Sequence, residues 1–269
     1  MKRFLLIILP LLLMIFWGCE DKSSVTPQST FTRTFGESGL DYGNSVQQTM
    51  DGGYVIAGVK ERQPPFLFQA WLIKADSQGE EEWNKTFGGY GFDHGLSVQQ
   101  TMDGGYIVGG NSFVETCSDC WSYDFLLIKT DFQGEAEWTK TFGGDDLDRG
   151  LSVQQTTDGG YIIIGHTYSF GNGDRDIWLI KVDSQGEKEW DQTFGGSSED
   201  EGSSVQQTID GGYIITGNTS GLNGWAEAWL IKVDSQGEQE WDRIFDRSDG
   251  SYIAYGKFVQ QTIDGGYII

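Results

Sequence analysis

The sequence predicts an all-β fold built from repeated units of four short antiparallel strands. The phrase Asp-Gly-Gly-Tyr occurs five times, with steps of 52, 55, 52 and 54 residues between its aspartates, which are Asp51, Asp103, Asp158, Asp210 and Asp264. Each unit alternates segments rich in β-branched and aromatic residues with turns that contain Gly and Asp. No segment after the N-terminal apolar run spaces its apolar residues by about 3.6, so no helix is expected there.

The third unit shows how each strand is bounded. Its expected strands, named a to d in chain order, span residues 152–156, 161–165, 177–182 and 189–194. Thr-Asp-Gly-Gly separates strands a and b, and Asp-Ser-Gln-Gly separates strands c and d. Because Asp-Gly and Gly readily adopt the positive φ of tight hairpins, each of these pairs is expected to be antiparallel neighbours.

Four antiparallel strands recurring at a fixed period of about 50 residues are typical of a β-propeller blade. A β-solenoid or a stacked sandwich is the alternative, although solenoids with repeats of this length usually carry helices. Strand b of the third unit is almost continuously apolar, which fits a strand covered on both faces by neighbouring blades. We expect the tryptophan that recurs in strand d to fill the space between blades; it occurs as Trp83, Trp138, Trp190 and Trp241.

The repeat can be written GGxxxDxGxSVQQTxDGGYIIxGxT…DxWLIKxDSQGExEW. It resembles the β-propeller repeats of bacterial and archaeal extracytoplasmic proteins, and the resemblance spans residues 31–269. The resemblance implies the fold but no particular activity, because such propellers carry unrelated functions.

The N-terminus has the features of a secretory signal. Met1-Lys-Arg is followed by an apolar run over residues 4–17 and then by Gly18-Cys19. The junction resembles the lipobox of bacterial lipoproteins, which implies a signal peptide over 1–18, a lipidated Cys19 and a polar tether over 19–30. Acyl chains on Cys19 would hold the protein on a membrane. The alternative is an ordinary signal peptide or an anchor helix.

These features place the protein in the bacterial cell envelope, lipid-anchored and outside the cytoplasm. Acidic residues directly after Cys19 resemble the export signals of Bacteroidetes-type surface lipoproteins, so the outer membrane or the cell surface is the expected location. The chain has 18 basic and 40 acidic side chains, for a net charge of −22. A field of this sign repels nucleic acid, which excludes nucleic acid as a partner.

The repeat region begins and ends at different points of the four-strand unit. Residues 31–36 align with strand d alone, and the chain stops after strands a and b of a fifth unit. We therefore expect the N-terminal segment to complete the last blade of a ring of at least five blades. On this interpretation the sequence is a fragment that lacks at least one strand c.

The candidate binding face lies where the connections between repeats vary. The a–b and c–d turns are nearly constant, whereas the b–c and d–a connections differ in length and content, and variable loops on a rigid scaffold often carry specificity. Aromatic rings beside carboxylates suit sugars; the alternative is that the rings pack beneath their own loops. The candidate ligand-binding residues are Phe66, Phe68, Trp121, Tyr123, Tyr168, Phe170, Asp174, Asp176, Trp225 and Glu227.

A calcium site is a weaker prediction. The d–a connections repeat Asp-x-Gly, and one of them offers the hard oxygen ligands of Asp145, Asp146 and Asp148. The spacing of a complete calcium loop is missing, and an aspartate that accepts hydrogen bonds from its own turn would explain the repetition as well. No other cofactor is expected.

The remaining reactive residues predict no catalytic centre. Cys117 and Cys120 are expected to form a disulfide that closes a long loop, because a second zinc-binding pair is missing. His94 and His166 stand at unrelated positions of different units, so paired metal ligation is not expected. Arg is scarce in the variable connections, which argues against an arginine triad for sialic acid.

The sequence thus predicts a non-catalytic binding or scaffold module for a glycan or a protein. One alternative is a polysaccharide-active hydrolase or lyase with paired carboxylates on the variable face. Another is a purely structural envelope protein.

Overall fold

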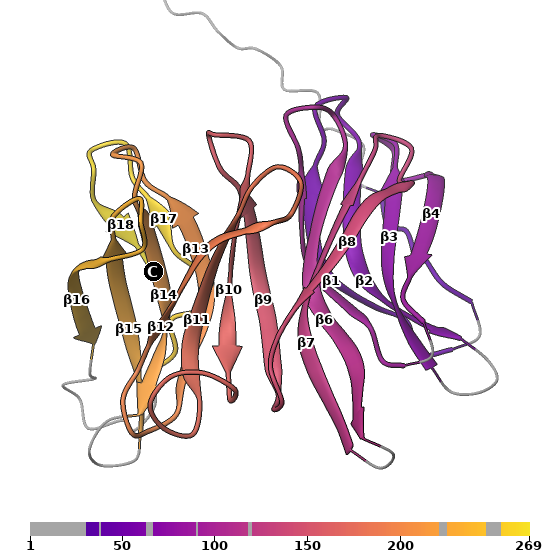
Figure 1. The fold of residues 1–269 in the computed structure, drawn as a ribbon. Coiled ribbons are helices and arrows are strands. Elements are labelled where there is room, and N and C mark those ends of the chain that lie inside the picture. Colours follow the sequence, from indigo (N-terminus) through magenta and orange to yellow (C-terminus); the bar gives the residue numbers. More distant parts are fainter. Residues whose placement is uncertain are drawn as a thin grey trace, which may run out of the picture. The chain divides into compact units, whose positions relative to one another are not determined.

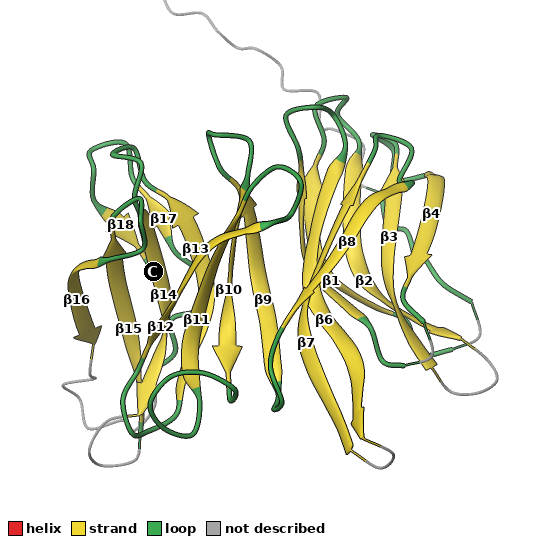
Figure 2. Ribbon diagram, viewed as in Figure 1, coloured by secondary structure: helices red, strands yellow, loops and turns green. Residues whose placement is uncertain are grey.

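In the computed structural model, every regular element is a strand (Figures 1 and 2). The structure describes residues 31–37, 39–62, 67–89, 91–117, 120–220, 225–245 and 254–269. In these ranges there is no helix, and hence none long and apolar enough to cross a membrane. Cys19 and the tether lie outside the described residues, and residues 33–269 form one compact unit.

Four sheets of four antiparallel strands follow one another along the chain, with neighbouring strands in sequence order. Sheet 1 contains β1 (Tyr42–Gln48), β2 (Tyr54–Arg62), β3 (Leu67–Ala75) and β4 (Glu81–Phe87). Sheet 2 contains β5 (His94–Gln100), β6 (Tyr106–Cys117), β7 (Cys120–Thr130) and β8 (Ala136–Phe142). Sheet 3 contains β9 (Asp148–Gln155), β10 (Tyr161–Thr167), β11 (Asp176–Val182) and β12 (Lys188–Phe194). Sheet 4 contains β13 (Asp200–Gln207), β14 (Tyr213–Ser220), β15 (Ala226–Val233) and β16 (Gln239–Phe245), and a hairpin of β17 (Gln260–Gln261) and β18 (Tyr267–Ile268) follows.

The predicted four-stranded antiparallel repeat is confirmed, with one correction to strand a. In the third repeat, strand a begins at Asp148 rather than at residue 152, because the Asp-x-Gly segment pairs with the end of β10. A register shift between Ile164 and Gly165 interrupts the regular pairing at this point. A bulge of this kind breaks the alternation of side chains, which is why the segment looks like a loop in the sequence.

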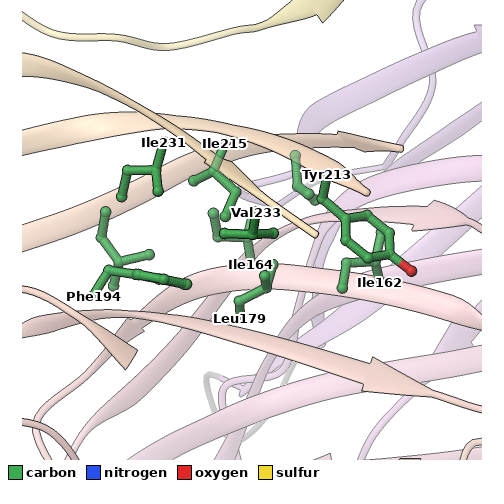
Figure 3. Close-up of a cluster of buried hydrophobic side chains, with 10 residues drawn as sticks. Ile162, Ile164, Leu179, Phe194, Tyr213, Ile215, Ile231 and Val233 are labelled. Carbon is green, nitrogen blue, oxygen red and sulfur yellow. The ribbon is translucent and has the colours of Figure 1, made fainter. Parts of the chain in front are cut away.

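Successive sheets pack face to face through apolar side chains. Ile162, Ile164, Leu179 and Phe194 of sheet 3 meet Tyr213, Ile215, Ile231 and Val233 of sheet 4 (Figure 3). Equivalent clusters join sheets 1 and 2 and sheets 2 and 3. Three strand-d tryptophans fill these interfaces as predicted, because the ring centre of each lies 5.7 or 5.8 Å from that of the Asp-Gly-Gly-Tyr tyrosine of the next repeat; the pairs are Trp83–Tyr106, Trp138–Tyr161 and Trp190–Tyr213. Trp241 makes the same contact with Tyr267 at 5.8 Å but is exposed.

The first strands of the repeats lie next to one another and surround one space. β1, β5, β9 and β13 contact each other in that order. The Ser-Val-Gln segments of four repeats, together with Phe258 and Val259 of the fifth, line a single cavity of about 370 Å³, which we call the central cavity. The sheets are therefore arranged like blades whose first strands are innermost.

The repeated Gln-Gln dipeptide joins neighbouring repeats through hydrogen bonds. Oε1 of Gln154 accepts a bond of 2.6 Å from the backbone N–H of Gln207, one repeat later. In the other direction, Oε1 of Gln207 accepts a bond of 2.8 Å from the backbone N–H of Thr157. The same two bonds recur at the junctions of repeats 1 and 2, 2 and 3, and 4 and 5. The dipeptide is thus repeated because it fixes the spacing of the sheets.

Candidate functional site

One pocket of about 320 Å³ lies at the variable edge of the sheets, and we call it the axial pocket. Sheets 2 and 3 and the start of β13 supply its walls. Leu96 and Leu151 line it and directly precede Ser97 and Ser152, which line the central cavity, so the two spaces adjoin along the innermost strands. The other lining residues are His94, Asn111, Tyr123, Arg149, His166, Arg175 and Glu201.

The repeat geometry explains why these side chains meet. His94, Arg149 and Glu201 are the middle residues of Asp-x-Gly in three successive repeats, and each lies at the start of an innermost strand. Asn111 and His166 are their partners on strand b. Tyr123, within β7, and Arg175, directly before β11, are equivalent residues that each precede an aspartate of strand c, Asp124 or Asp176. Each repeat therefore offers three equivalent positions to this edge.

The repeated aspartate before each of these residues secures the backbone. Asp148 is fully buried, and its Oδ2 accepts bonds of 2.8 Å from the N–H of Gly144 and the hydroxyl of Ser169. Asp200 is also buried, and its Oδ2 accepts a bond of 3.0 Å from the N–H of Gly196. Each carboxylate thus holds the preceding turn against the strand, which fixes where the next side chain begins.

Of the two arginines in the axial pocket, Arg175 is paired with carboxylates and Arg149 is not, among the described residues. Arg175 lies 3.1 Å from Glu199 and 3.5 Å from Glu201. The guanidinium of Arg149 lies 5.4 Å from the ring centre of Tyr123. Because a cation above an aromatic face is attracted to it, this contact orients Arg149 without neutralising it.

Both histidines of the axial pocket are held neutral. Burial, together with the charges of Arg175 and Arg149, lowers the pKa of His166 to about 3. Burial and Arg149 also lower the pKa of His94, although Asp93 opposes the shift. A neutral imidazole has one donor and one acceptor nitrogen, so these rings can form hydrogen bonds of both kinds with a ligand.

Three polar atoms in this lining have no hydrogen-bond partner among the described residues: Asn111 Oδ1, His166 Nδ1 and Arg175 Nε. Asn111 and His166 are each only 4% exposed. A buried polar atom without a partner costs free energy, so these atoms indicate a place where a ligand or water binds.

An aromatic cluster continues from one side of the axial pocket. The Tyr123 ring lies 6.1 Å from that of His94 and 6.0 Å from that of Phe113. Phe68 lies 6.3 Å from His94 and 5.6 Å from Phe92. Of the residues predicted to bind ligand, Tyr123 lines the pocket and Phe68 supports its wall.

The other predicted residues lie elsewhere on the variable edge. Phe170 is 42% exposed but packs 4.9 Å from Trp178, and Tyr168 packs against His166. Trp225 and Asp174 are exposed, and Glu227 is half-buried in β15. Phe66 and the side chain of Trp121 lie outside the described residues.

The predicted disulfide and calcium site remain predictions. Cys117 and Cys120 pair across the β6–β7 hairpin, but their side chains lie outside the described residues. Asp145 and Asp146 are exposed, whereas Asp148 is buried and holds a turn. In the described part of the chain, no three or more His, Cys, Asp or Glu residues are grouped to hold a metal ion.

Most of the axial pocket is not apparent from the sequence. The sequence predicts unrelated positions for His94 and His166 and few arginines on this face, yet two histidines and two arginines line this one space. The signal was the middle residue of Asp-x-Gly, which changes from repeat to repeat between a constant Asp and a constant Gly. In repeats 1 to 4 it is Tyr42, His94, Arg149 and Glu201.

Close carboxylates occur at two sheet junctions on the same edge. Burial and the charge of Asp148 raise the pKa of Asp124 to about 6. Burial and the charge of Asp200 also raise the pKa of Asp176, although a bond from the Asn172 N–H opposes the shift. Oδ1 of Asp176 and Oδ2 of Asp200 lie 1.8 and 2.6 Å from the position that a Cβ on Gly195 would occupy, so the two carboxylates are close.

Because burial and repulsion from Asp148 both disfavour the charged form of Asp124, we expect Asp124→Asn to stabilise the protein at neutral pH. The pKa of Asp124 is higher in the folded than in the unfolded chain, so the folded state loses stability as the pH rises from about 4 through 6. We expect a gain of about 1–2 kcal/mol at pH 8, after allowance for solvent screening, that disappears near pH 4. Urea unfolding at both pH values measures it.

Asp93→Asn is the matched control. Gln69 takes the place of the second carboxylate at that junction, and Oδ1 of Asp93 accepts bonds from Ser112 (2.7 Å) and from the N–H of Phe113 (3.2 Å). This variant should lose about 1 kcal/mol. A gain for Asp93→Asn, or none for Asp124→Asn at pH 8, would contradict the account.

Comparison with known proteins identifies no family. No protein-family model matches the chain, and no curated protein matches it. The crystal structure of a protein of unknown function from Bacteroides caccae is similar, with a TM-score of 0.40 and 13% identity over 78% of this chain and 83% of that one. A similarity of this size carries no argument about function.

Proposed function

We propose that this protein is a lipid-anchored β-propeller of the cell envelope that binds a glycan in its axial pocket without chemical reaction. One observation carries the proposal: three repeats each bring their variable residues to one pocket, whereas the repeated residues hold the sheets together. A rigid scaffold with one variable concave site is the usual arrangement of a binding module.

Closure into a ring is supported by contacts of the N-terminal segment. Lys85 and Lys140, both in strand d, form ion pairs of 2.5 and 2.6 Å with Glu135 and Glu187 of the next repeat. Arg33 forms the corresponding ion pair with Glu80 of sheet 1. This ion pair supports the proposal that residues 31–36 lie beside sheet 1 in the position of a strand d.

A glycan fits the chemistry of the axial pocket. Sugars offer C–H faces that pack on aromatic rings and hydroxyls that both donate and accept hydrogen bonds. Tyr123 supplies a ring, and Asn111 and the two neutral histidines supply donors and acceptors. The volume is at the lower end of the range for ligand pockets and suits a single sugar residue.

A polysaccharide lyase is the second candidate, and it is favoured by the neutral His94, which could accept a proton near Arg149. A hydrolase is less favoured, because it needs two facing carboxyl groups. In the described lining of the axial pocket Glu201 is the single carboxylate, and it pairs with Arg175.

A glycan array followed by calorimetry tests the binding proposal. The purified protein should bind a defined glycan and leave it intact, and Tyr123→Ala and Asn111→Ala should abolish binding. Ile209→Ala, at an 83% exposed position of an a–b turn, is the control and should bind normally. Cleaved products would instead support the lyase, and the absence of any glycan binding would favour a protein partner or a purely structural role.

The membrane anchor is a separate part of the proposal. It is supported by the Gly18-Cys19 junction after the apolar run. Labelling of the protein with a fatty acid in cells should be lost in Cys19→Ser. Equal labelling of both forms would refute lipidation at this residue.

A further inference from the structure

The axial pocket holds a cation, Arg149, that no carboxylate pairs with in the described chain, although the molecule as a whole is strongly negative. The whole chain carries a net charge of −22, yet the titratable lining comprises two arginines, one glutamate, two neutral histidines and a tyrosine. Glu201 is shared between Arg175, at 3.5 Å, and Lys257, at 4.0 Å. A local positive site in a negative protein attracts an anionic group of a ligand while the remaining surface repels it.

Arg149 is the charge available to a ligand. Its side chain is exposed and forms no ion pair among the described residues. Its guanidinium lies over the Tyr123 ring. Arg175 uses two guanidinium nitrogens for Glu199 and Glu201, and its Nε has no partner within the described chain. His166 is shielded from solvent and lines the same pocket as both arginines.

We propose that the axial pocket selects glycans that contain a uronic acid, with Arg149 binding the sugar carboxylate and Arg175 Nε and His166 Nδ1 donating to it. The proposal rests on the glycan-binding function above and adds the class of sugar. Arg is well suited to this task because its planar guanidinium can bind both oxygens of a carboxylate. Nδ1 of His166 is the donor in one of the two neutral tautomers.

A carboxylate fits the charge better than a phosphate. Arg175 is paired with Glu199 and Glu201, which leaves Arg149 as the one cation of the described lining without a carboxylate partner, and one such cation matches a single negative charge. A phosphate monoester carries close to two negative charges at pH 7. The neutral face of the sugar would then contact Tyr123, with Asn111 Oδ1 accepting from a hydroxyl.

Calorimetry with matched oligosaccharides tests the proposal on the intact protein. The probes are oligomers of galacturonate and glucuronate and the corresponding neutral oligomers of galactose and glucose. We expect at least one uronate oligomer to bind at least tenfold more tightly than its neutral counterpart. Raising the ionic strength should weaken this preference, because a partly exposed ion pair is screened by salt.

Arg149→Ala should reduce the uronate affinity at least tenfold, and Arg149→Lys should restore part of it. Arg243→Ala, at an exposed position of β16, is the matched control and should change nothing. Circular dichroism verifies that each variant is folded.

The outcomes separate the two proposals. Equal binding of neutral and acidic oligomers, unaffected by Arg149→Ala, would overturn the uronate inference and leave the glycan-binding function intact. Tighter binding of sulfated or phosphorylated oligomers than of uronates would also overturn it. If no oligomer of either kind binds and the array is negative as well, both proposals fail.

Discussion

Gly165→Ala is expected to destabilise the protein by about 3 kcal/mol or more. A Cβ on Gly165 would stand 1.8 Å from the carbonyl oxygen of Arg149, on the neighbouring strand β9. The obstacle is backbone, so no side-chain rotation relieves the clash, and β9 must move away from β10. Forced overpacking of this kind typically costs 1–3 kcal/mol, and more where backbone hydrogen bonds are also lost.

The same displacement should impair the axial pocket, since Arg149 lines it. Thermal unfolding measures the loss of stability, and calorimetry measures the loss of ligand affinity. Gly196→Ala is the control, because a Cβ there meets nothing within 4 Å and its φ is not in the left-handed region. An unfolding temperature for Gly165→Ala equal to that of wild type would show that the strands separate more easily than this close approach implies.

The fold was largely predictable because the repeat carries its turn chemistry with it. Asp-Gly-Gly marks the a–b hairpin of every unit and Asp-x-Gln-Gly marks the c–d hairpin of the first four units, and Gly159 and Gly186 indeed adopt φ of 88° and 78°. The predicted start of strand a was wrong for two reasons. Asp-x-Gly contains an aspartate and a glycine, which are common in loops, and a bulge hides the pairing of this segment with strand b.

The sequence predicts the edge of the sheets at which the candidate site lies, but not most of the residues that line it. Variation in loop length indicates the edge where strands b and c meet, and the axial pocket lies at that edge. Loop variation predicted Phe170 and Trp225 as binding residues, and neither lines the axial pocket. It did not predict His94, Arg149 and Arg175, which do line it. His94 and Arg149 occupy equivalent positions on strand a of adjacent sheets, whereas Arg175 precedes strand c of sheet 3. They meet because of the angle between the sheets, which sequence spacing alone does not supply.

Lys181→Ala is the second substitution with a large expected effect, about 3 kcal/mol. The Lys181 side chain is 3% exposed, and its ammonium lies 3.0 Å from Asp158 and 2.7 Å from Glu189. It also donates to the carbonyl oxygen of Val182 at 3.1 Å, so one cation joins the a–b turn to strands c and d. Removal leaves a cavity in place of the buried lysine stem and two half-exposed carboxylates without their cation, so lost packing and lost charge both lower stability.

The pH dependence of the stability lost in Lys181→Ala shows whether the ion pair with Asp158 causes that loss. Burial raises the pKa of Asp158, but hydrogen bonds from Thr156, Gly160 and Lys181 outweigh it and lower the pKa to about 2. A carboxyl whose pKa is lowered by folding adds stability above about pH 4, and that stability is lost as the pH falls toward 2. Lys181→Ala should therefore lower stability most at pH 7 and lose part of its effect at pH 3.

Lys188→Ala provides the comparison within the same sheet. Its ion pair of 2.8 Å with Asp191 is at the surface, with the lysine side chain 47% exposed. Exposed pairs contribute little, so this variant should change stability by no more than about 0.5 kcal/mol. Chemical unfolding of both variants at pH 7 and pH 3 measures the contrast. If Lys181→Ala costs no more than Lys188→Ala, the repeated lysine does not join the strands, and the recurrence of Lys74, Lys129, Lys181 and Lys232 needs another explanation.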